Sequence, residues 1–257
     1  MSERTLLSAE DIGKRFGGVQ ALADVSFSIR HGEIYGLIGP NGAGKTSLFN
    51  VLTGIYEPDG GSFTFDGAPL NRLKPNEVAE RGIARTFQNI RLFQNLSALE
   101  NVMIGRHVRT RAGVFGAIFR DRATLAEEAA ITSRAYQLLD YVGVATRAND
   151  LAKHLAYGDQ RRLEIARALA TEPKLIALDE PAAGMNATEK VVLRELIDRI
   201  RKDGRTILLI EHDVKLVMGL CDRVTVLDYG KQIAEGTPYD MQKNEKVIEA
   251  YLGTGGH

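Results

Sequence analysis

The sequence has little of three features that would each point to a particular class of protein. A single cysteine, Cys221, stands among 257 residues, which excludes an internal disulfide and fits a reducing compartment. Its apolar surroundings, "LVMGLCDRV", predict a buried and inert thiol. Lys plus Arg and Asp plus Glu number 33 each, so the basic excess of a typical nucleic-acid binder is missing. We therefore expect no nucleic-acid partner.

Long apolar runs are also missing. No stretch approaches the roughly 18 consecutive apolar residues of a membrane span. The first residues, "MSERTLLSAED", are charged and lack the apolar core of a signal peptide. We expect a cytoplasmic protein that contacts a membrane only through a partner.

The hydrophobic pattern predicts one large α/β domain. The early runs "VSFSI" and "SFTF" alternate as in a half-covered sheet. The later runs "KLIALDEP", "RTILLIEH" and "RVTVLDYG" are apolar and separated by helical segments, which indicates a buried, largely parallel sheet. Residues from about 90 to 170 look mainly helical. Ser97 with Glu100, and Asn186 with Glu189, have the spacing of a capping box and predict two helix starts.

A glycine-rich loop predicts a phosphate site. Residues 39–46, "GPNGAGKT", match G-x-x-x-x-G-K-[ST], with an apolar strand before them and an amphipathic helix after. Backbone N–H groups of such a loop wrap phosphates, the lysine contacts the β- and γ-phosphates, and the hydroxyl ligates Mg²⁺. The residues expected to bind the nucleotide are Gly39, Pro40, Asn41, Gly42, Ala43, Gly44, Lys45, Thr46 and Ser47, of which Thr46 is also a metal ligand.

A pair of acidic residues at the end of an apolar run favours hydrolysis. In "LIALDEP", Asp179 is placed to hold Mg²⁺, directly or through water. Glu180 is then placed to orient and polarise an attacking water. A water-activating carboxylate beside the metal carboxylate favours ATP hydrolysis over transfer to another substrate.

With these motifs in this order, the chain resembles the nucleotide-binding subunits of ABC transporters over nearly its whole length. The resemblance implies a P-loop NTPase core, an antiparallel β subdomain and an inserted helical subdomain. The expected division of the single domain 1–257 is 1–87 for the β subdomain and phosphate-loop core, 88–170 for the helical subdomain, and 171–257 for the remaining core and C-terminal segment.

The same resemblance implies three further residues at the nucleotide. Gln88 in "RTFQN" would contact the metal and the water, and His212 in "LLIEHD" would contact the γ-phosphate. Phe16 in "KRFGG" would stack on adenine, with a ring that lacks the more usual tyrosine hydroxyl. The loop "PAAGMN" after Glu180 looks like the dimer-contact loop of the family.

A variant signature follows in "LAYGDQRRLEIARAL". In the family a segment L-S-G-G-Q completes the ATP site of the opposite subunit, and here it reads Leu155, Ala156, Tyr157, Gly158, Asp159. Residues 156–159 would thus act on the partner's nucleotide. The serine hydroxyl is missing at Ala156, and Tyr157 replaces a glycine, which limits the backbone if a positive φ is required there. Asp159 is a candidate N-cap for its own helix.

The "LAYG" variant, with "GIARTFQNIRLF" and "IEHDVKLVM", resembles the ATPase subunits of branched-chain amino acid importers. This resemblance implies ATP and Mg²⁺ as ligands. The implied partners are transmembrane permease subunits and a second ATPase subunit, in a homodimer or a heterodimer, with a periplasmic or extracellular binding protein as an indirect partner. The chain would lie on the inner face of the membrane. The alternatives are a lipid or lipopolysaccharide export ATPase and a soluble ABC ATPase that does not act in transport.

Residues 104–130 form a longer segment of the expected helical subdomain. Phe115, Ile118 and Phe119 have helical spacing, and arginines flank them. Two interpretations stay open: a solvated helical face over a small core, or a surface that contacts the membrane partner or lipid headgroups.

Overall fold

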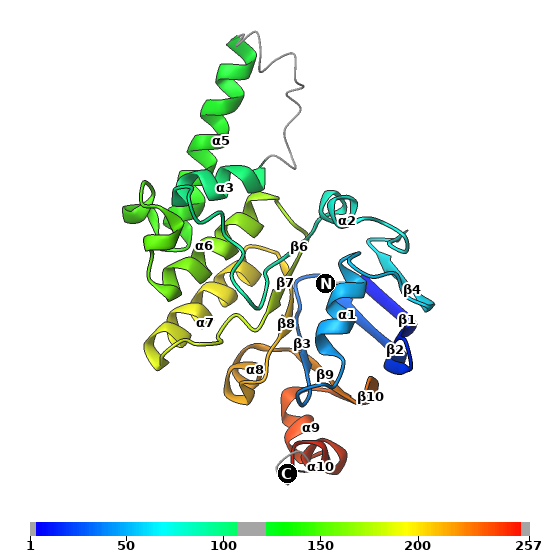
Figure 1. Ribbon diagram of the computed structural model, residues 1–257. Helices are drawn as coiled ribbons and strands as arrows, with labels where there is room; N and C mark the ends of the chain where they lie inside the picture. Colours follow the sequence, from blue (N-terminus) through cyan, green and yellow to red (C-terminus); the bar gives the residue numbers. More distant parts are fainter. Residues whose placement is uncertain (1–3, 107–121, 253–257) are drawn as a thin grey trace.

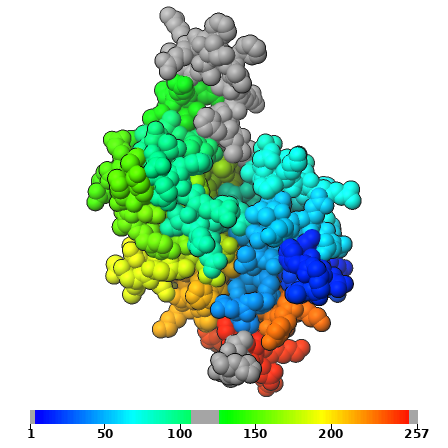
Figure 2. Space-filling view, viewed as in Figure 1, coloured from blue at the N-terminus to red at the C-terminus, as the bar shows by residue number. Residues whose placement is uncertain are grey.

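Two sheets and the helices around them make up the computed structural model, which describes residues 4–106 and 122–252. Figure 1 shows the central sheet between a helical side, with α3, α5, α6 and α7, and a second side that carries α1 and the other sheet. The same two sides lie next to each other in the space-filling view of Figure 2. This α/β architecture agrees with the sequence-based prediction.

The central sheet has six strands in the order β10-β9-β3-β8-β7-β6. All neighbours pair in parallel except β10, which is antiparallel to β9. Every residue of β3, β7 and β8 is buried, as the apolar runs predict. The strands are β3 (Ile34–Ile38), β6 (Ile83–Arg85), β7 (Leu175–Asp179), β8 (Thr206–Ile210), β9 (Arg223–Asp228) and β10 (Lys231–Gly236).

The second sheet is antiparallel, in the order β2-β1-β4-β5. Buried and half-buried residues alternate along much of β2 and β4, which confirms the alternation seen in "VSFSI" and "SFTF". Its strands are β1 (Thr5–Phe16), β2 (Val19–Arg30), β4 (Gly60–Phe65) and β5 (Ala68–Pro69).

Two hydrophobic cores lie on opposite faces of the central sheet. Successive residues of a strand enter different cores: Ile34 and Ile38 pack with the helical side, whereas Tyr35 and Leu37 pack with α1 and the antiparallel sheet. The six-stranded sheet therefore joins both halves of the molecule, and the ends of its strands lie between them.

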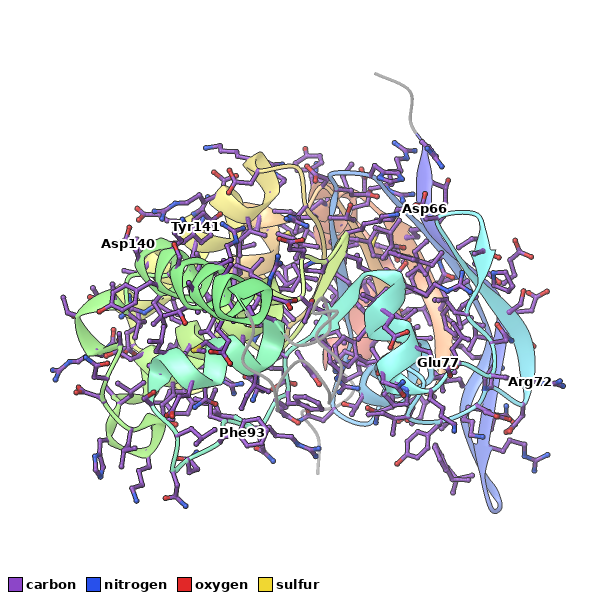
Figure 3. The ribbon with its side chains drawn as sticks, turned by 90° about the horizontal axis from the view of Figure 1, so that it is seen from above. Asp66, Arg72, Glu77, Phe93, Asp140 and Tyr141 are labelled. Carbon is purple, nitrogen blue, oxygen red and sulfur yellow. The ribbon has the colours of Figure 1, made fainter. Side chains whose placement is uncertain are left out.

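The helices divide between the two sides in the same way. Helices α3, α5 and α6 pack against one another, and Figure 3 shows Asp140 and Tyr141 at the end of α5, across the molecule from Glu77 of α2. The helices are α1 (Lys45–Leu52), α2 (Pro75–Arg81), α3 (Ala98–Arg106), α5 (Arg122–Tyr141), α6 (Tyr157–Ala170), α7 (Ala187–Lys202), α8 (Val214–Leu220), α9 (Pro238–Lys243) and α10 (Glu245–Leu252), with 3₁₀ turns at Ala145–Arg147 and Ala152–His154.

Both predicted capping boxes are present. Ser97 precedes α3, where its hydroxyl accepts from the Glu100 amide at 3.2 Å and its own amide donates to the Glu100 carboxylate at 2.7 Å. Asn186 caps α7 in the same reciprocal way with Glu189, at 2.9 Å in both directions.

Three sequence-based expectations have different outcomes. Cys221 is buried, and burial raises the pKa of its thiol to about 12, as expected for an inert cysteine. Phe115, Ile118, Phe119 and most of the surrounding 104–130 segment lie outside the described residues. The division at residues 87/88 and 170/171 stays a prediction. Within the described ranges, no helix is both long enough and apolar enough to cross a membrane.

The close packing of α3 on α6 gives the first testable prediction. A Cβ at Gly105 would lie 2.3 Å from the Arg167 carbonyl oxygen and 3.1 Å from the Ala170 Cβ. Gly105→Ala must push the two helices apart, so we expect a loss of about 1–3 kcal/mol in the free energy of unfolding. Gly60→Ala, on an open strand position with no atom within 4 Å, is the matched control and should be within about 0.5 kcal/mol of wild type. Equal stability of both variants in denaturant titrations would contradict the packing shown here.

Candidate functional site

The phosphate loop connects β3 to α1 at the middle of the central sheet. Strand β3 lies between β8 and β9, and the loop leaves from its carboxyl end, where ligands bind in open α/β sheets. A Cβ at Gly39 would lie 2.1 Å from the Leu227 carbonyl oxygen. Gly44 has φ 99° and lies so close to the Ala21 carbonyl that a Cβ would be 2.7 Å away. Both positions therefore require glycine for conformation and for space.

Gly44 is also the N-cap of α1. Among the described residues no side chain caps this helix, and its first turn has no acidic residue. The first N–H groups and the positive end of the helix dipole are thus directed at the loop without a competing carboxylate of α1 itself, which favours an anionic ligand.

Lys45 folds back over the loop that precedes it. Its Nζ donates to the carbonyl oxygens of Gly39 at 2.6 Å and Pro40 at 2.9 Å, and the residue is buried. Burial lowers the pKa of the ammonium, while the nearby carboxylates of Glu180 and Asp179 oppose that shift. The charge is therefore held at the loop by carbonyl oxygens, which a phosphate oxygen can replace.

The loop borders a cavity of ≈ 410 Å³. Asn41, Gly42, Ala43, Gly44, Lys45, Thr46, Ser47, Gln88 and Glu180 line it, together with five residues that the sequence analysis did not identify, Val19, Gln20, Ala21, Tyr229 and Gly230. These five come from β2 and from the turn after β9, and the amide of Gly230 donates to the Ala43 carbonyl at 3.0 Å. Only the "YG" turn after an apolar strand offered a sequence signal for them.

Asp179 is the last residue of β7 and directly precedes Glu180, which lines this cavity. The residue is 3% exposed, and its amide donates to the Thr86 hydroxyl at 3.3 Å. Burial raises the pKa of its carboxyl group from 3.8 to about 6, against the opposing effects of Arg85 and Lys45. Because ionising this buried carboxyl group is costly, the site favours a bound cation that offsets the negative charge.

Two residues expected at the nucleotide, Gln88 for the metal and the water and His212 for the γ-phosphate, meet the carboxylate of the expected base, Glu180, at one oxygen. The Gln88 amide nitrogen Nε2 is 3.0 Å from Glu180 Oε2, and His212 Nδ1 is 3.6 Å from the same oxygen. Glu180 itself has φ 45°, an uncommon conformation for a non-glycine residue. A cavity of ≈ 690 Å³ adjoins the cluster, and it is lined by Gly39, Pro40, Asn41, Gln88, Glu180, His212 and Tyr251.

Phe16 lies outside the residues that line these two cavities. It ends β1 at the hairpin to β2, is 41% exposed, and meets the edge of Tyr56 at 5.1 Å between ring centroids. Its strand neighbour Val19 does line the cavity of the phosphate loop, so the ring lies beside that cavity. Adenine stacking by Phe16 stays a prediction.

Residues 156–159 form the start of α6 and line neither of the cavities at the phosphate loop. Ala156 is the N-cap and makes no side-chain cap, and neither Tyr157 nor Gly158 has a positive φ, so tyrosine in place of glycine causes no backbone strain. The prediction that Asp159 is the N-cap was wrong. The N-cap is Ala156, three residues earlier, and the Asp159 carboxylate in the first turn pairs with Arg162, three residues further along the helix.

Gly158 has a packing reason within the chain. A Cβ there would lie 2.7 Å from the Glu189 Oε1 atom of the capping box that starts α7. The "PAAGMN" loop and the start of α6 are thus packed together, with Asn186 as the cap of α7.

Comparison with known proteins agrees with this geometry. The ABC transporter family model matches residues 22–183, and the model of the branched-chain amino acid ATP-binding cassette transporter matches residues 231–257. The high-affinity branched-chain amino acid transport ATP-binding protein LivG of Salmonella typhimurium is 45% identical over 249 residues, which cover 96% of this chain and 98% of LivG. The crystal structure of the ADP conformation of MJ1267, an ATP-binding cassette of an ABC transporter, superposes with a TM-score of 0.85 at 32% identity, covering 97% and 99% of the two chains.

The chain belongs to the ABC transporter family of ATP-binding cassettes, and ATP hydrolysis is the activity of that family. A relative with a different role is more distant: the lipopolysaccharide export system ATP-binding protein LptB of Escherichia coli is 34% identical, over 96% of this chain and 97% of LptB.

The buried carboxyl group of Asp179 gives a prediction for the protein without ligands. The unfolded chain ionises this group near pH 3.8, whereas the folded chain holds the proton to about pH 6. Between these values the folded state binds more protons, so this residue lowers stability progressively as the pH rises from about 4 to 6. Above pH 6 the contribution of Asp179 to the free energy of unfolding stays constant, about 3 kcal/mol lower than below pH 4.

Asp179→Asn should therefore be more stable than wild type at pH 7.5, and the difference should shrink as the pH falls to about 4. Asp198→Asn is the control, because Lys202 lowers the pKa of that exposed carboxyl group instead. Thermal unfolding across this pH range measures both. A stability difference between Asp179→Asn and wild type that does not change with pH would contradict the assignment.

Proposed function

We propose that this chain is the ATP-hydrolysing subunit that powers a membrane importer of branched-chain amino acids. The observation that carries the solute class is the similarity to LivG over nearly the full length of both chains, together with the match at the C-terminal end to the branched-chain cassette model. The greater distance to LptB makes lipopolysaccharide export the weaker candidate.

In this proposal ATP binds with its phosphates over the N-terminus of α1. Lys45 moves its charge from the Gly39 and Pro40 carbonyl oxygens to the β- and γ-phosphates. The ring of Phe16 stacks on adenine beside the cavity.

The residues present fit a magnesium ion at the phosphates. Within the described ranges, no group of three or more His, Cys, Asp or Glu side chains could hold a metal. Magnesium bound to ATP needs no such group, since it takes one or two carboxylates and several phosphate and water oxygens. Thr46, Asp179 and Gln88 would hold it, and its charge would stabilise the developing charge on the phosphates.

Glu180 then acts as the general base. Its carboxylate accepts a proton from the attacking water, which Gln88 helps to position at the same oxygen, and His212 beside it contacts the γ-phosphate. Glu180 lines both cavities at the phosphate loop, where a water in line with the γ-phosphate would lie.

Residues 156–159 serve a second ATPase subunit in this proposal. They lie away from the chain's own phosphate loop, so they can complete a nucleotide site only on another molecule. Two subunits, of the same or of a different sequence, would close head to tail on two ATP molecules and reopen after hydrolysis. Transmembrane permease subunits would hold them at the cytoplasmic face of the membrane, with a periplasmic or extracellular binding protein as an indirect partner and no nucleic acid.

Uptake of radiolabelled leucine tests both the solute and the catalytic assignment. Cells that lack the gene for this chain should lose most high-affinity leucine uptake and regain it with the wild-type gene. Glu180→Gln should not restore uptake, because the amide keeps the shape but loses the base; we expect ATP to bind normally and hydrolysis to fall by about 100-fold or more.

Two outcomes would contradict the proposal. Normal leucine uptake in the deletion, with defective delivery of lipopolysaccharide to the cell surface, would favour the export alternative. Hydrolysis by purified Glu180→Gln at the wild-type rate would show that Glu180 is not the base. Glu195→Gln, on the exposed side of α7, is the matched control and should behave as wild type.

A further inference from the structure

Helix α6 holds the segment that contains Gln88 by three charged side chains at three-residue spacing. Arg161 Nη1 donates to the Phe87 carbonyl at 2.6 Å, and Nη2 donates to the Gln88 carbonyl. Glu164 Oε1 accepts from the amides of Phe87 at 3.3 Å and Arg91 at 3.4 Å. Arg167 donates to the Arg91 carbonyl at 2.6 Å. These contacts fix the backbone on both sides of Gln88.

Burial restricts the side-chain orientations that Arg161 and Glu164 can adopt. Arg161 and Glu164 are 3% and 1% exposed, and they pair with each other at 3.4 Å. Buried charges are tolerated only where their donors and acceptors are satisfied, so the guanidinium has little freedom to turn. A displacement of Arg161 must therefore be accompanied by a displacement of the Gln88 backbone.

Tyr157 connects Arg161 to the start of the helix. Its hydroxyl lies 3.0 Å from Nη2 and 3.3 Å from Nε of Arg161. Its ring packs against Gly184 of the loop after Glu180, where a Cβ would be 3.1 Å from the Tyr157 Cε1 atom. Tyr157 is nevertheless 43% exposed, at the first residue of α6. One side chain thus contacts the helix start, the loop at Gly184 and the arginine that holds Gln88.

We infer that Tyr157 and Arg161 are positioning residues that set Gln88 for catalysis and couple it to the nucleotide on the opposite subunit. The inference rests on the proposed function in one respect, the assignment of residues 156–159 to the partner's ATP. When that ATP contacts the start of α6, Tyr157 and Arg161 transmit the contact to the Gln88 carbonyl. Gln88 then holds its side chain at the Glu180 carboxylate, 3.0 Å away. This role accounts for a tyrosine where the related signature has glycine.

The mildest test is Tyr157→Phe, which removes the hydroxyl and keeps the ring on Gly184. ATP hydrolysis is measured with the full chain assembled with its membrane subunits. The same assembly with Glu180→Gln in this chain measures the hydrolysis that comes from the second ATPase subunit, and this rate is subtracted. We expect kcat to fall about 10- to 100-fold, the effect of losing one hydrogen bond to a charged group, and KM for ATP to change less than about twofold. Tyr136→Phe, an exposed tyrosine on α5, is the control and should leave kcat unchanged.

A double-mutant cycle separates positioning from simple packing. On a Gln88→Ala background, Tyr157→Phe should have no further effect on kcat, because the group through which it acts is gone. Arg161→Lys, which keeps the charge but loses the forked donors, should show the same dependence on Gln88 with a larger loss. A full effect of Tyr157→Phe on the Gln88→Ala background, or an unchanged kcat of Tyr157→Phe itself, would overturn the inference. Neither readout depends on leucine, so failure of the proposed solute would leave this result interpretable.

Discussion

The burial of opposite charges at the carboxyl edge of the central sheet is the constraint on which the site depends. Lys45 and Asp179 are 6% and 3% exposed. Burial lowers the pKa of Lys45 and raises the pKa of Asp179, so it favours the neutral form of each side chain. Lys45 donates to carbonyl oxygens, whereas the Asp179 carboxyl group retains a proton to about pH 6. A polyphosphate with its cation satisfies both groups at once, since it brings anionic oxygens to the ammonium and a positive charge to the carboxylate.

The rest of the fold serves to hold these two groups at one place. Lys45 is the first residue of α1, which follows β3, and Asp179 is the last residue of β7. Both strands are fully buried and lie either side of β8, so their ends are fixed by two hydrophobic cores on opposite faces. Because residues 39 and 44 are glycines, the carbonyl groups of Leu227 and Ala21 can approach the loop closely. Backbone atoms rather than side chains therefore surround the loop at these two positions.

Much of this could be predicted because its signals are local. The phosphate loop, the acidic pair after an apolar strand and the caps at Ser97 and Asn186 each occupy a few consecutive residues. Gln20 at the cavity, and the hydrogen bonds from Arg161 to the Phe87 and Gln88 carbonyl oxygens, join segments far apart in sequence and have no local signal. Aspartate is a common N-cap, so the sequence predicts the start of α6 three residues too late, whereas Asp159 lies in the first turn and pairs with Arg162.

We propose that residues 39–47 bind the phosphates of ATP through the charge of Lys45. Calorimetric titration of the full chain with Mg-ATP tests it directly, with Lys45→Ala and, as a control for loss of a lysine, Lys202→Ala, whose ammonium pairs with Asp198 on the surface of α7. Removal of a buried charge that contacts two phosphates should weaken binding by about 100-fold or more, while Lys202→Ala should bind as wild type. Binding by Lys45→Ala within about threefold of wild type, which is under 1 kcal/mol, would contradict the account.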